Sequence, residues 1–212
     1  VRIGFRRTLD AGRVLASSII YTGTVSDVSQ SSRADVRLSY AHRPYDSAWI
    51  WFNRLDYIDE RIGFVSGDNH TRKLVNNLNA NWMPRRDTQV SLQYSSKYVL
   101  DDIEGIKNSG YVDLAGVELR HDLSRDWDIG GHASLLHSWD GDEKRYGVGI
   151  SLGYKVMDNT WVAAGYNLSG FDDADFSGAA YRRQGPYIAL RMKFDQDTIK
   201  QLKGNGLFTR VP

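Results

Sequence analysis

The chain has little of what defines several common classes of protein. Its 212 residues contain no cysteine, which excludes a disulfide scaffold, a cysteine–zinc site and thiol catalysis. Lysine and arginine total 27 and aspartate and glutamate total 26, so the net charge of +1 gives no bulk positive charge for holding nucleic acid. No run of about 18 apolar residues exists, and this excludes a membrane-spanning helix.

Glycine and aromatic residues are abundant instead. The chain has 20 Gly, 12 Tyr and 6 Trp against 4 Pro and 3 Met, a balance typical of β structure. In residues 146–156, six apolar residues alternate with glycine, serine and lysine, which predicts a strand with one apolar face. The mean hydropathy of −0.47 is compatible with such strands in a membrane, because alternating residues average to a polar value.

Alternation of this kind recurs along the whole chain, and no segment has a helical period. The segments suit a tilted membrane strand of about 9–11 residues better than a soluble strand of about 5–6. We expect eleven strands, near 1–8, 13–24, 33–43, 48–58, 71–83, 88–99, 111–123, 127–138, 145–156, 161–170 and 185–194. Short connections alternate with longer ones, which are expected around 25–32, 59–70, 100–110, 139–144 and 171–184, as in outer-membrane barrels.

The predicted fold is all-β, an antiparallel up-and-down transmembrane β-barrel of about 10–12 strands. Residues 1–194 are expected to form the barrel, and residues 195–212 a polar C-terminal tail. A soluble barrel with its apolar face inside is the alternative, because alternation alone does not say which face is inward. Strand length, unequal connections and the placement of tryptophan favour the membrane. The expected interface belts contain Trp49, Trp82, Trp127 and Trp161 beside short turns and Trp139 near the other rim.

Strand parity and the last strand suggest how the chain is related to a larger protein. Barrels whose chains begin and end in the periplasm have an even number of strands. Since eleven are counted and Val1 is not a methionine, we expect an upstream strand and a C-terminal piece of a longer chain; a complete 10- or 12-stranded barrel is the alternative. The strand at 185–194 is similar to the signal strand read by the outer-membrane assembly machinery, through Tyr187, Leu190, Met192 and Phe194.

Four stretches carry a resemblance to a known family. They are Pro-Arg-Arg-Asp-Thr-Gln-Val at 84–90, Leu-Ser-Arg-Asp-Trp-Asp-Ile-Gly at 123–130, Trp-Val-Ala-Ala-Gly-Tyr-Asn-Leu-Ser-Gly-Phe at 161–171 and Gln-Gly-Pro-Tyr-Ile-Ala-Leu-Arg-Met-Lys-Phe-Asp-Gln at 184–196. Over residues 80–196 the chain resembles the C-terminal outer-membrane β-barrel domain of large repeat-bearing Gram-negative envelope proteins. These proteins carry arrays of immunoglobulin-like or similar β domains upstream of the barrel.

The resemblance implies a membrane anchor or translocation domain in the bacterial outer membrane. The expected partners are outer-membrane lipid and lipopolysaccharide, the assembly machinery that reads the last strand, and upstream domains of the same polypeptide; no nucleic acid and no cofactor are expected. No functional residue can be carried over from the family.

Charged residues on the faces opposite the apolar ones are expected to line the barrel lumen. Two readings remain open: the charges pair across neighbouring strands and fill a narrow lumen, or a ring of basic residues forms a weakly anion-preferring, porin-like channel for ions or small solutes. The predicted lumen-lining residues are Arg37, Arg54, Lys97, Glu118, Arg120, Lys155, Arg191 and Lys193, with Asp35, Asp56 and Asp128 as further inward acids.

Acidic clusters and two catalytic motifs complete the sequence. The clusters at 101–104, 140–143 and 172–175 are expected on extracellular loops, either solvated or binding divalent cations that bridge lipopolysaccharide; no metal site is predicted within the protein. Gly149–Gly153 matches G-x-S-x-G but lies inside an alternating strand instead of a sharp turn. His132 and Ser134 resemble the His-x-Ser of outer-membrane phospholipase but point inward. A lipid-acting enzyme is therefore the third hypothesis, and no catalytic residue is predicted.

Overall fold

The structure is a computed structural model that describes residues 1–10, 12–26, 29–44, 47–64, 67–157, 160–171, 175–176 and 184–192. Within these ranges the chain forms β-strands only, and no helix there is long and apolar enough to cross a membrane. The strands are β1 (Arg2–Asp10), β2 (Arg13–Val25), β3 (Ser29–His42), β4 (Trp49–Phe64), β5 (Gly67–Arg85), β6 (Thr88–Ile103), β7 (Ile106–Asp122), β8 (Trp127–Ser138), β9 (Glu143–Met157), β10 (Thr160–Ser169) and β11 (Gly185–Met192).

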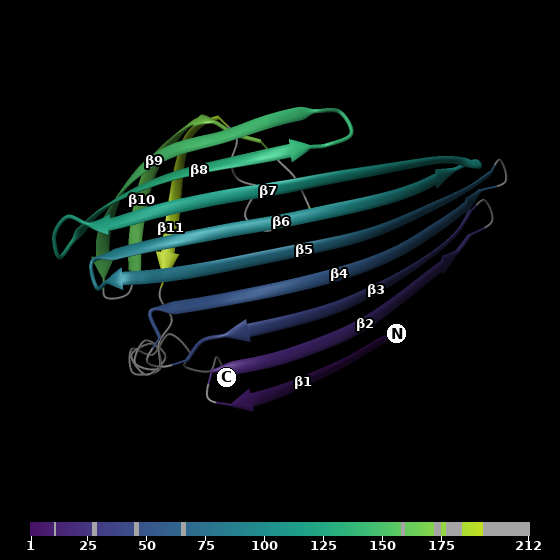
Figure 1. The fold of residues 1–212 in the computed structure, drawn as a ribbon, viewed down its shortest axis with the longest axis horizontal. Helices are drawn as coiled ribbons and strands as arrows, with labels where there is room; N and C mark the ends of the chain where they lie inside the picture. The colour runs from purple at the N-terminus through teal and green to yellow at the C-terminus, as the bar shows by residue number, and fades with distance from the viewer. Residues whose placement is uncertain are drawn as a thin grey trace, which may run out of the picture.

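All eleven strands belong to one antiparallel sheet in which each strand pairs with the next along the chain (Figure 1). This order makes the fold an up-and-down meander, and it confirms the predicted all-β, antiparallel architecture and the expected number of strands. Among the described residues, β1 and β11 each have one outer edge without a strand partner. Because successive strands alternate in direction, β1 and β11 have the same sense in the strand order, although the curvature of the sheet turns β11 steeply away from the direction of β1 (Figure 1).

The central strands are longer than predicted, and two of the expected long connections were wrong. Residues 59–64 and 67–70 belong to β4 and β5, and most of 100–110 belongs to β6 and β7. The turn between β6 and β7 contains only Glu104 and Gly105, both at positive φ of 52° and 85°, as in tight hairpins. At about 3.3 Å per residue, the 19 residues of β5 span roughly 60 Å, about twice the thickness of a bilayer core.

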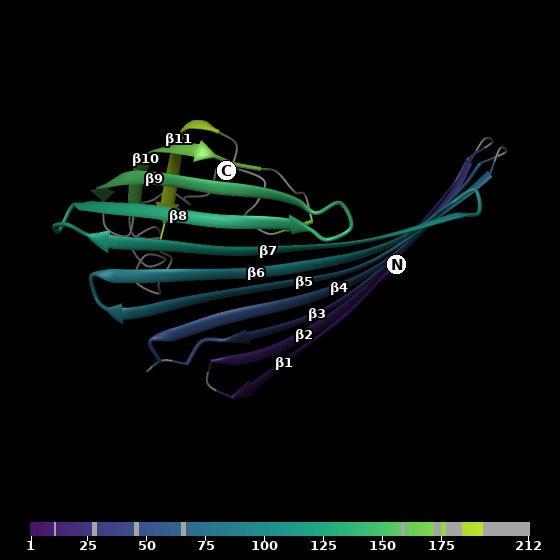
Figure 2. The same cartoon turned by 45° about the horizontal axis from the view of Figure 1, so that its top comes forward.

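The extra length lies at one rim of the sheet, where the β4–β5 and β6–β7 hairpins project beyond β8 and β9, level with the β2–β3 hairpin (Figure 2). Residues at this rim that were expected in loops belong to strands, and their polar side chains pair across neighbouring strands. For example, His70 on β5 lies 3.1 Å from the Asp59 carboxylate on β4. Cross-strand polar pairs of this kind stabilise a hairpin outside an apolar environment. The expected difference between the two rims is therefore present, but as projecting hairpins.

One face of the sheet is apolar and exposed across every strand; we refer to it as the apolar face. On β9 the side chains from Tyr146 to Val156 that alternate onto this face are 39–61% exposed, whereas the intervening Gly147, Gly149, Ser151 and Gly153 are buried. Residues opposite one another in register share a face. The apolar face includes Ile3, Ile19, Leu38, Leu55, Leu74, Leu92, Leu119, Ile129, Ile150, Val162 and Leu190.

The other face, which we refer to as the polar face, is strongly curved between β8 and β11 (Figures 1 and 2). Arg191 on β11 reaches Asp128 on β8 at 2.6 Å, past β9 and β10. Gly153 on β9 permits this contact, since a Cβ there would lie 2.5–2.7 Å from atoms of Arg191 and Asp128. Gly165 on β10 similarly leaves space for the ring of Tyr187. Glycine therefore allows long side chains to cross the curved face.

Candidate functional site: the polar face and its plug

The predicted inward charges lie on the polar face wherever the structure describes them. Their positions follow from register: Arg37 is opposite Asp56, and Arg191 is opposite Trp161, which in turn is opposite Lys155. Lys193 lies outside the described residues. The residues placed on this face are Arg37, Arg54, Lys97, Glu118, Arg120, Lys155 and Arg191.

Asp56 is the centre of the first charge cluster. It is 7% exposed on β4, and the Nε atoms of Arg37 and Arg54 lie 2.5 Å and 2.7 Å from its two carboxylate oxygens. Two partly exposed arginines thus neutralise one buried carboxylate. Such a pairing corresponds to the reading in which charges pair across neighbouring strands.

Asp128 is the centre of a second and more buried cluster. Its side chain accepts hydrogen bonds from Arg120 at 2.5 Å and from Arg191 at 2.6 Å, and the residue is only 1% exposed. Arg120 also donates to Glu118 at 2.8 Å. The two cations and two anions balance, and the cluster links β7, β8 and β11 through side chains.

Between these clusters a row of amide and hydroxyl side chains follows β5 and β6. Ser95 donates to Asn77 at 2.9 Å, and Ser91 donates to Asn81 at 2.7 Å. A cavity of about 490 Å³ lies over this row, lined by Arg54, Asn77, Asn79, Asn81, Ser91, Gln93 and Glu118 among others. A second cavity of about 370 Å³ shares Ser91 and Glu118 with the first and extends to Arg120, Asp128, Trp161 and Arg191.

The asparagines of this row were missed as site residues by sequence reasoning. The available signal was asparagine at every second position from 77 to 81, which puts identical amides on one face of a strand. These amides add hydrogen-bonding groups to the floor of the first cavity without adding charge.

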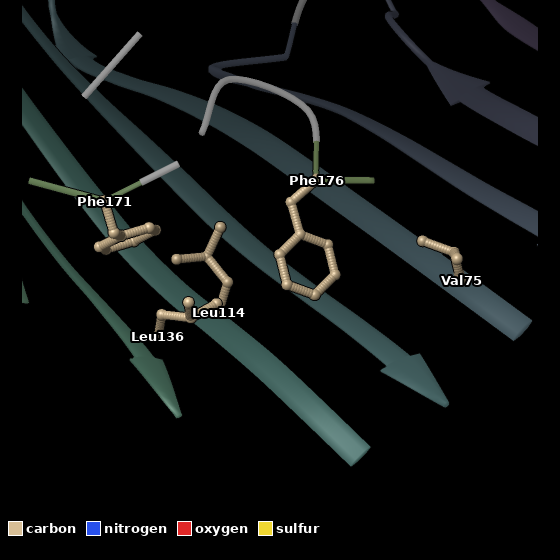
Figure 3. Close-up of a cluster of buried hydrophobic side chains, with 5 residues drawn as sticks. All are labelled: Val75, Leu114, Leu136, Phe171 and Phe176. Carbon is tan, nitrogen blue, oxygen red and sulfur yellow. The ribbon is translucent and has the colours of Figure 1, made fainter. Parts of the chain in front are cut away.

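The polar face is covered beyond Asn77 by residues that follow β10. Phe171 and Phe176 are 4% and 2% exposed, and they pack on Val75, Leu114 and Leu136 of the sheet (Figure 3). We refer to Phe171, Asp175 and Phe176 together as the plug. Burial of these two aromatic side chains contributes a few kcal/mol, which holds Phe171 and Phe176 against the sheet.

Asp175 fixes the plug electrostatically, and this corrects the expectation of a solvated loop for that residue. Its carboxylate accepts a hydrogen bond from Lys97 at 3.0 Å and lies 3.7 Å from Nζ of Lys73. The Lys97 ammonium is also 5.2 Å from the centre of the Phe176 ring, within cation–π range. Asp172 and Asp173 of the same cluster lie outside the described residues.

The pKa of Asp175 follows from its surroundings. Burial is the largest single influence and raises the pKa, but the hydrogen bond from Lys97 and the charges of Lys97 and Lys73 together lower it below the ordinary value of 3.8. A carboxyl group whose folded pKa is lowered stabilises the folded state above its unfolded pKa. That stabilisation is lost as the pH falls through the lowered value.

We therefore expect the plug to loosen only in acid, below about pH 4. Protonation of Asp175 removes its attraction to Lys73, Lys97 and the more distant Arg33, which is itself paired with Asp35. The measurement is protease cleavage near Phe176 as a function of pH, using an acid-stable protease. Asp175→Asn should cleave readily and without this pH dependence; an unchanged pH profile in that variant would contradict the assignment.

Aromatic pairs mark the ends of the apolar face. Trp49 stacks on Trp82 with ring centres 5.4 Å apart, and Trp127 packs against Tyr154 at 4.8 Å. Trp139, 58% exposed, lies at the other rim beside Tyr111. Trp161 does not share this arrangement: it lies opposite Arg191 on the polar face, so its placement in a lipid-facing belt was wrong. Adjacent residues of a strand point to opposite faces, so Val162 lies on the apolar face and Trp161 on the polar face.

The other predicted motifs have ordinary structural surroundings. Ser151 lies inside the regular strand β9, and Ser134 donates to the carbonyl of Gly147 at 3.5 Å. Tyr187 faces Gly165 on the polar face, and Leu190 is 64% exposed on the apolar face. Met192 ends β11, and Phe194 lies outside the described residues. In the part of the chain that the structure describes, no three His, Asp or Glu side chains gather as a metal site.

Comparisons with known proteins find similarity at the level of the fold. No protein-family model matches the chain, and no curated protein sequence matches it. Solved structures with a similar arrangement include the NanC porin, at 13% identity and a TM-score of 0.38, covering 91% of this chain and 98% of that one. The KdgM porin is similar at 16% identity and a TM-score of 0.40, with 92% and 91% covered.

Two further solved structures differ in their stated roles. The toluene transporter TodX of Pseudomonas putida has 9% identity and a TM-score of 0.46, covering 92% of this chain and 74% of that one. The translocator domain of the autotransporter NalP from Neisseria meningitidis has 13% identity and a TM-score of 0.38, with 91% and 78% covered. At these values the likeness does not extend to the activity of any of the four proteins.

Proposed function

We propose that the chain is a transmembrane β-barrel domain of a Gram-negative outer membrane, and that it anchors a larger envelope protein. The observation that carries the proposal is the continuous exposed apolar face on all eleven strands. Soluble monomers rarely expose an apolar patch larger than a few hundred Å². Lipid contact satisfies such a face, while the antiparallel ladders satisfy the backbone.

An anchor, in contrast to an open channel, is supported by how the polar face is filled. The charges around Asp56 and Asp128 are paired, and the plug covers Val75 and Leu114. A barrel with this interior holds its position in the membrane without a wide aqueous path. The proposed partners are outer-membrane lipid and lipopolysaccharide at the apolar face, the assembly machinery at β11, and upstream domains of the same polypeptide. No catalytic role is proposed.

A small channel is the second candidate, and the two adjoining cavities on the polar face favour it. Both have arginine and serine in their lining, together with apolar residues, and such polar groups suit hydrated solutes. The plug lies beside the cavities along β5 and β6, because Val75, which it covers, is two residues from Asn77 on the same face of β5. A solute that passes along this face would meet the plug, so conduction would require the plug to leave the polar face.

Conductance separates the two candidates. The refolded wild-type chain should shift on an unheated gel as a closed barrel does, and should conduct weakly in planar bilayers. Asp175→Asn/Phe176→Ala should raise conductance several-fold, because it removes both the ion pairs and the buried ring. Asp142→Asn, at an 83% exposed side chain in the β8–β9 turn, is the matched control and should change nothing.

Each outcome of that experiment bears on one candidate. If neither the wild type nor the plug variant conducts, the channel is excluded and the anchor stands. If the wild type conducts as strongly as the plug variant, the plug does not close the interior. Absence of a gel shift, together with a folded chain in detergent-free buffer, would contradict the barrel itself.

A further inference from the structure

Three arginines on the first and third strands line a hollow of about 340 Å³ on the polar face. Arg2 and Arg6 belong to β1, and Arg37 belongs to β3, with β2 between the two strands (Figure 1). The rest of the lining on this face consists of small residues, namely Gly4, Ala16, Ser18 and Ser39. The hollow thus has a floor of small residues and guanidinium groups on two sides.

Strand register places the three arginines around one point of the sheet. Gly4 pairs with Ser18, and Ser18 pairs with Arg37, so these residues form one row across β1, β2 and β3. Arg2 and Arg6 lie two residues to either side of Gly4, about 7 Å away along β1, and β3 lies about 10 Å from β1. Because arginine side chains are long, the three guanidinium groups can reach one ligand above Gly4 and Ser18.

The positive charge at this hollow exceeds the negative charge near it. Asp56 pairs with Arg37 and also with Arg54, so one carboxylate is shared by two cations. Within the part of the chain that the structure describes, Arg2 and Arg6 make no ion pair. Four arginines therefore face a single carboxylate, whereas the cluster around Asp128 is balanced.

A further acid in this region is already engaged by another arginine. Asp35 lies in the same cross-strand row as Arg2, with one residue of β2 between them. Its carboxylate accepts hydrogen bonds from Arg33 at 3.0 Å and 3.1 Å. The surplus of positive charge at the hollow therefore persists, and it favours an anion with more than one negative charge.

We propose that Arg2, Arg6 and Arg37 form a binding site for the phosphate group of a phosphorylated polar solute. Guanidinium groups donate paired hydrogen bonds to phosphate oxygens, and the hydroxyl groups of Ser18 and Ser39 are further donors in the same lining. The inference rests on the proposed barrel in one respect, since a barrel would enclose the polar face. It adds a ligand class and two arginines of β1 that sequence reasoning did not place in the lumen.

The probe is glucose 6-phosphate, and glucose is the matched control ligand. Both are hydrophilic, so equilibrium dialysis on refolded, heat-modifiable protein in a non-ionic detergent at low ionic strength measures binding to the protein. Arg6→Gln should weaken the binding of glucose 6-phosphate about fivefold or more. Arg7→Gln removes the same charge from the next residue of β1, which lies on the apolar face opposite Leu15, and should bind like the wild type.

Gly4→Val tests the hollow without removing a charge. A Cβ at Gly4 would make only ordinary contacts, at 3.6 Å from the carbonyl oxygen of Ser17 and 3.8 Å from Cβ of Ser18. Valine therefore fits the strand, but its methyl groups fill the floor between Arg2 and Arg6. This variant should remain heat-modifiable and should bind glucose 6-phosphate no better than glucose.

Four results would overturn the site. Equal weakening by Arg6→Gln and Arg7→Gln would show attraction to net charge alone, and unchanged binding by Gly4→Val would place the phosphate elsewhere. Displacement of glucose 6-phosphate by phosphatidic acid added to the micelles would make a lipid headgroup the ligand in place of a solute. Heat-modifiable wild-type protein that binds both sugars equally would contradict the site alone. Wild-type protein without a heat-modifiable band would instead contradict the barrel, so the two failures are distinguishable.

Discussion

Replacing Ile150 by arginine should prevent stable insertion of the sheet into a membrane. Ile150 is 61% exposed in the middle of β9, between Tyr146 and Tyr154 on the same face. If lipid covers this face, the guanidinium lies near the centre of the hydrocarbon layer, where arginine costs a barrel about 2–4 kcal/mol. The free energy of unfolding in lipid vesicles, from urea titration, measures this cost.

Ile106→Arg is the matched control for Ile150→Arg. Ile106 is 67% exposed beside the turn at the projecting end of the β6–β7 hairpin, where water is expected at either side. Its replacement by arginine should cost no more than about 1 kcal/mol. Equal stability of the two variants in vesicles would contradict a lipid-facing apolar face. A folded Ile150→Arg chain that is soluble without detergent would support the soluble alternative.

Replacing Asp128 by alanine should be the most destabilising change on the polar face. The carboxylate of Asp128 is almost fully buried and accepts hydrogen bonds from Arg120 and Arg191. Removing one partner of a buried ion pair costs about 3–5 kcal/mol, because the remaining charge stays desolvated. Since the Arg191 side chain is 31% exposed, solvent screens part of this cost, and about 3 kcal/mol is expected. Urea titration in vesicles measures the effect.

A second substitution distinguishes loss of charge balance from loss of packing. Asp128→Ala/Arg191→Met removes one anion and one cation, and it leaves Arg120 paired with Glu118 at 2.8 Å. This double variant should recover more than half of the lost free energy of unfolding. Asp126→Ala, in the exposed turn before β8, is the matched control and should remain within about 0.5 kcal/mol of the wild type. A double variant as unstable as Asp128→Ala would contradict the electrostatic explanation.

The strand pattern could be predicted because side-chain direction in a strand depends only on sequence parity. Alternation at 146–156 identified both faces of β9, and the same rule placed Arg37 and Arg120 on the polar face. The rule failed at two kinds of position. Trp161 was assigned to a lipid-facing belt from its place beside a turn, not from its parity. Residues 59–70 were expected to be a loop because their strands carry polar side chains on both faces.

The plug could not be predicted, because its partners are distant in the sequence. Asp175 and Lys97 are 78 positions apart, and nothing in the cluster at 172–175 distinguishes an inward carboxylate from a solvated one. The same holds for Arg191 and Asp128, which are 63 positions apart and meet only because the sheet curves and Gly153 leaves space. Which charged side chains pair depends on the curvature of the sheet, and the alternation of apolar and polar residues in the sequence does not predict that curvature.

The sequence by itself determined the class of the fold, the number of strands and the side on which most residues lie, since these follow from a period of two and from local turn residues. Only the tertiary structure decided what the polar face does with its charges. Sheet curvature brings Arg191 to Asp128, and the fold places Phe176 and Asp175 against Val75 and Lys97. These contacts join residues far apart in the chain, and their energies depend on burial, which exists only once the sheet has folded.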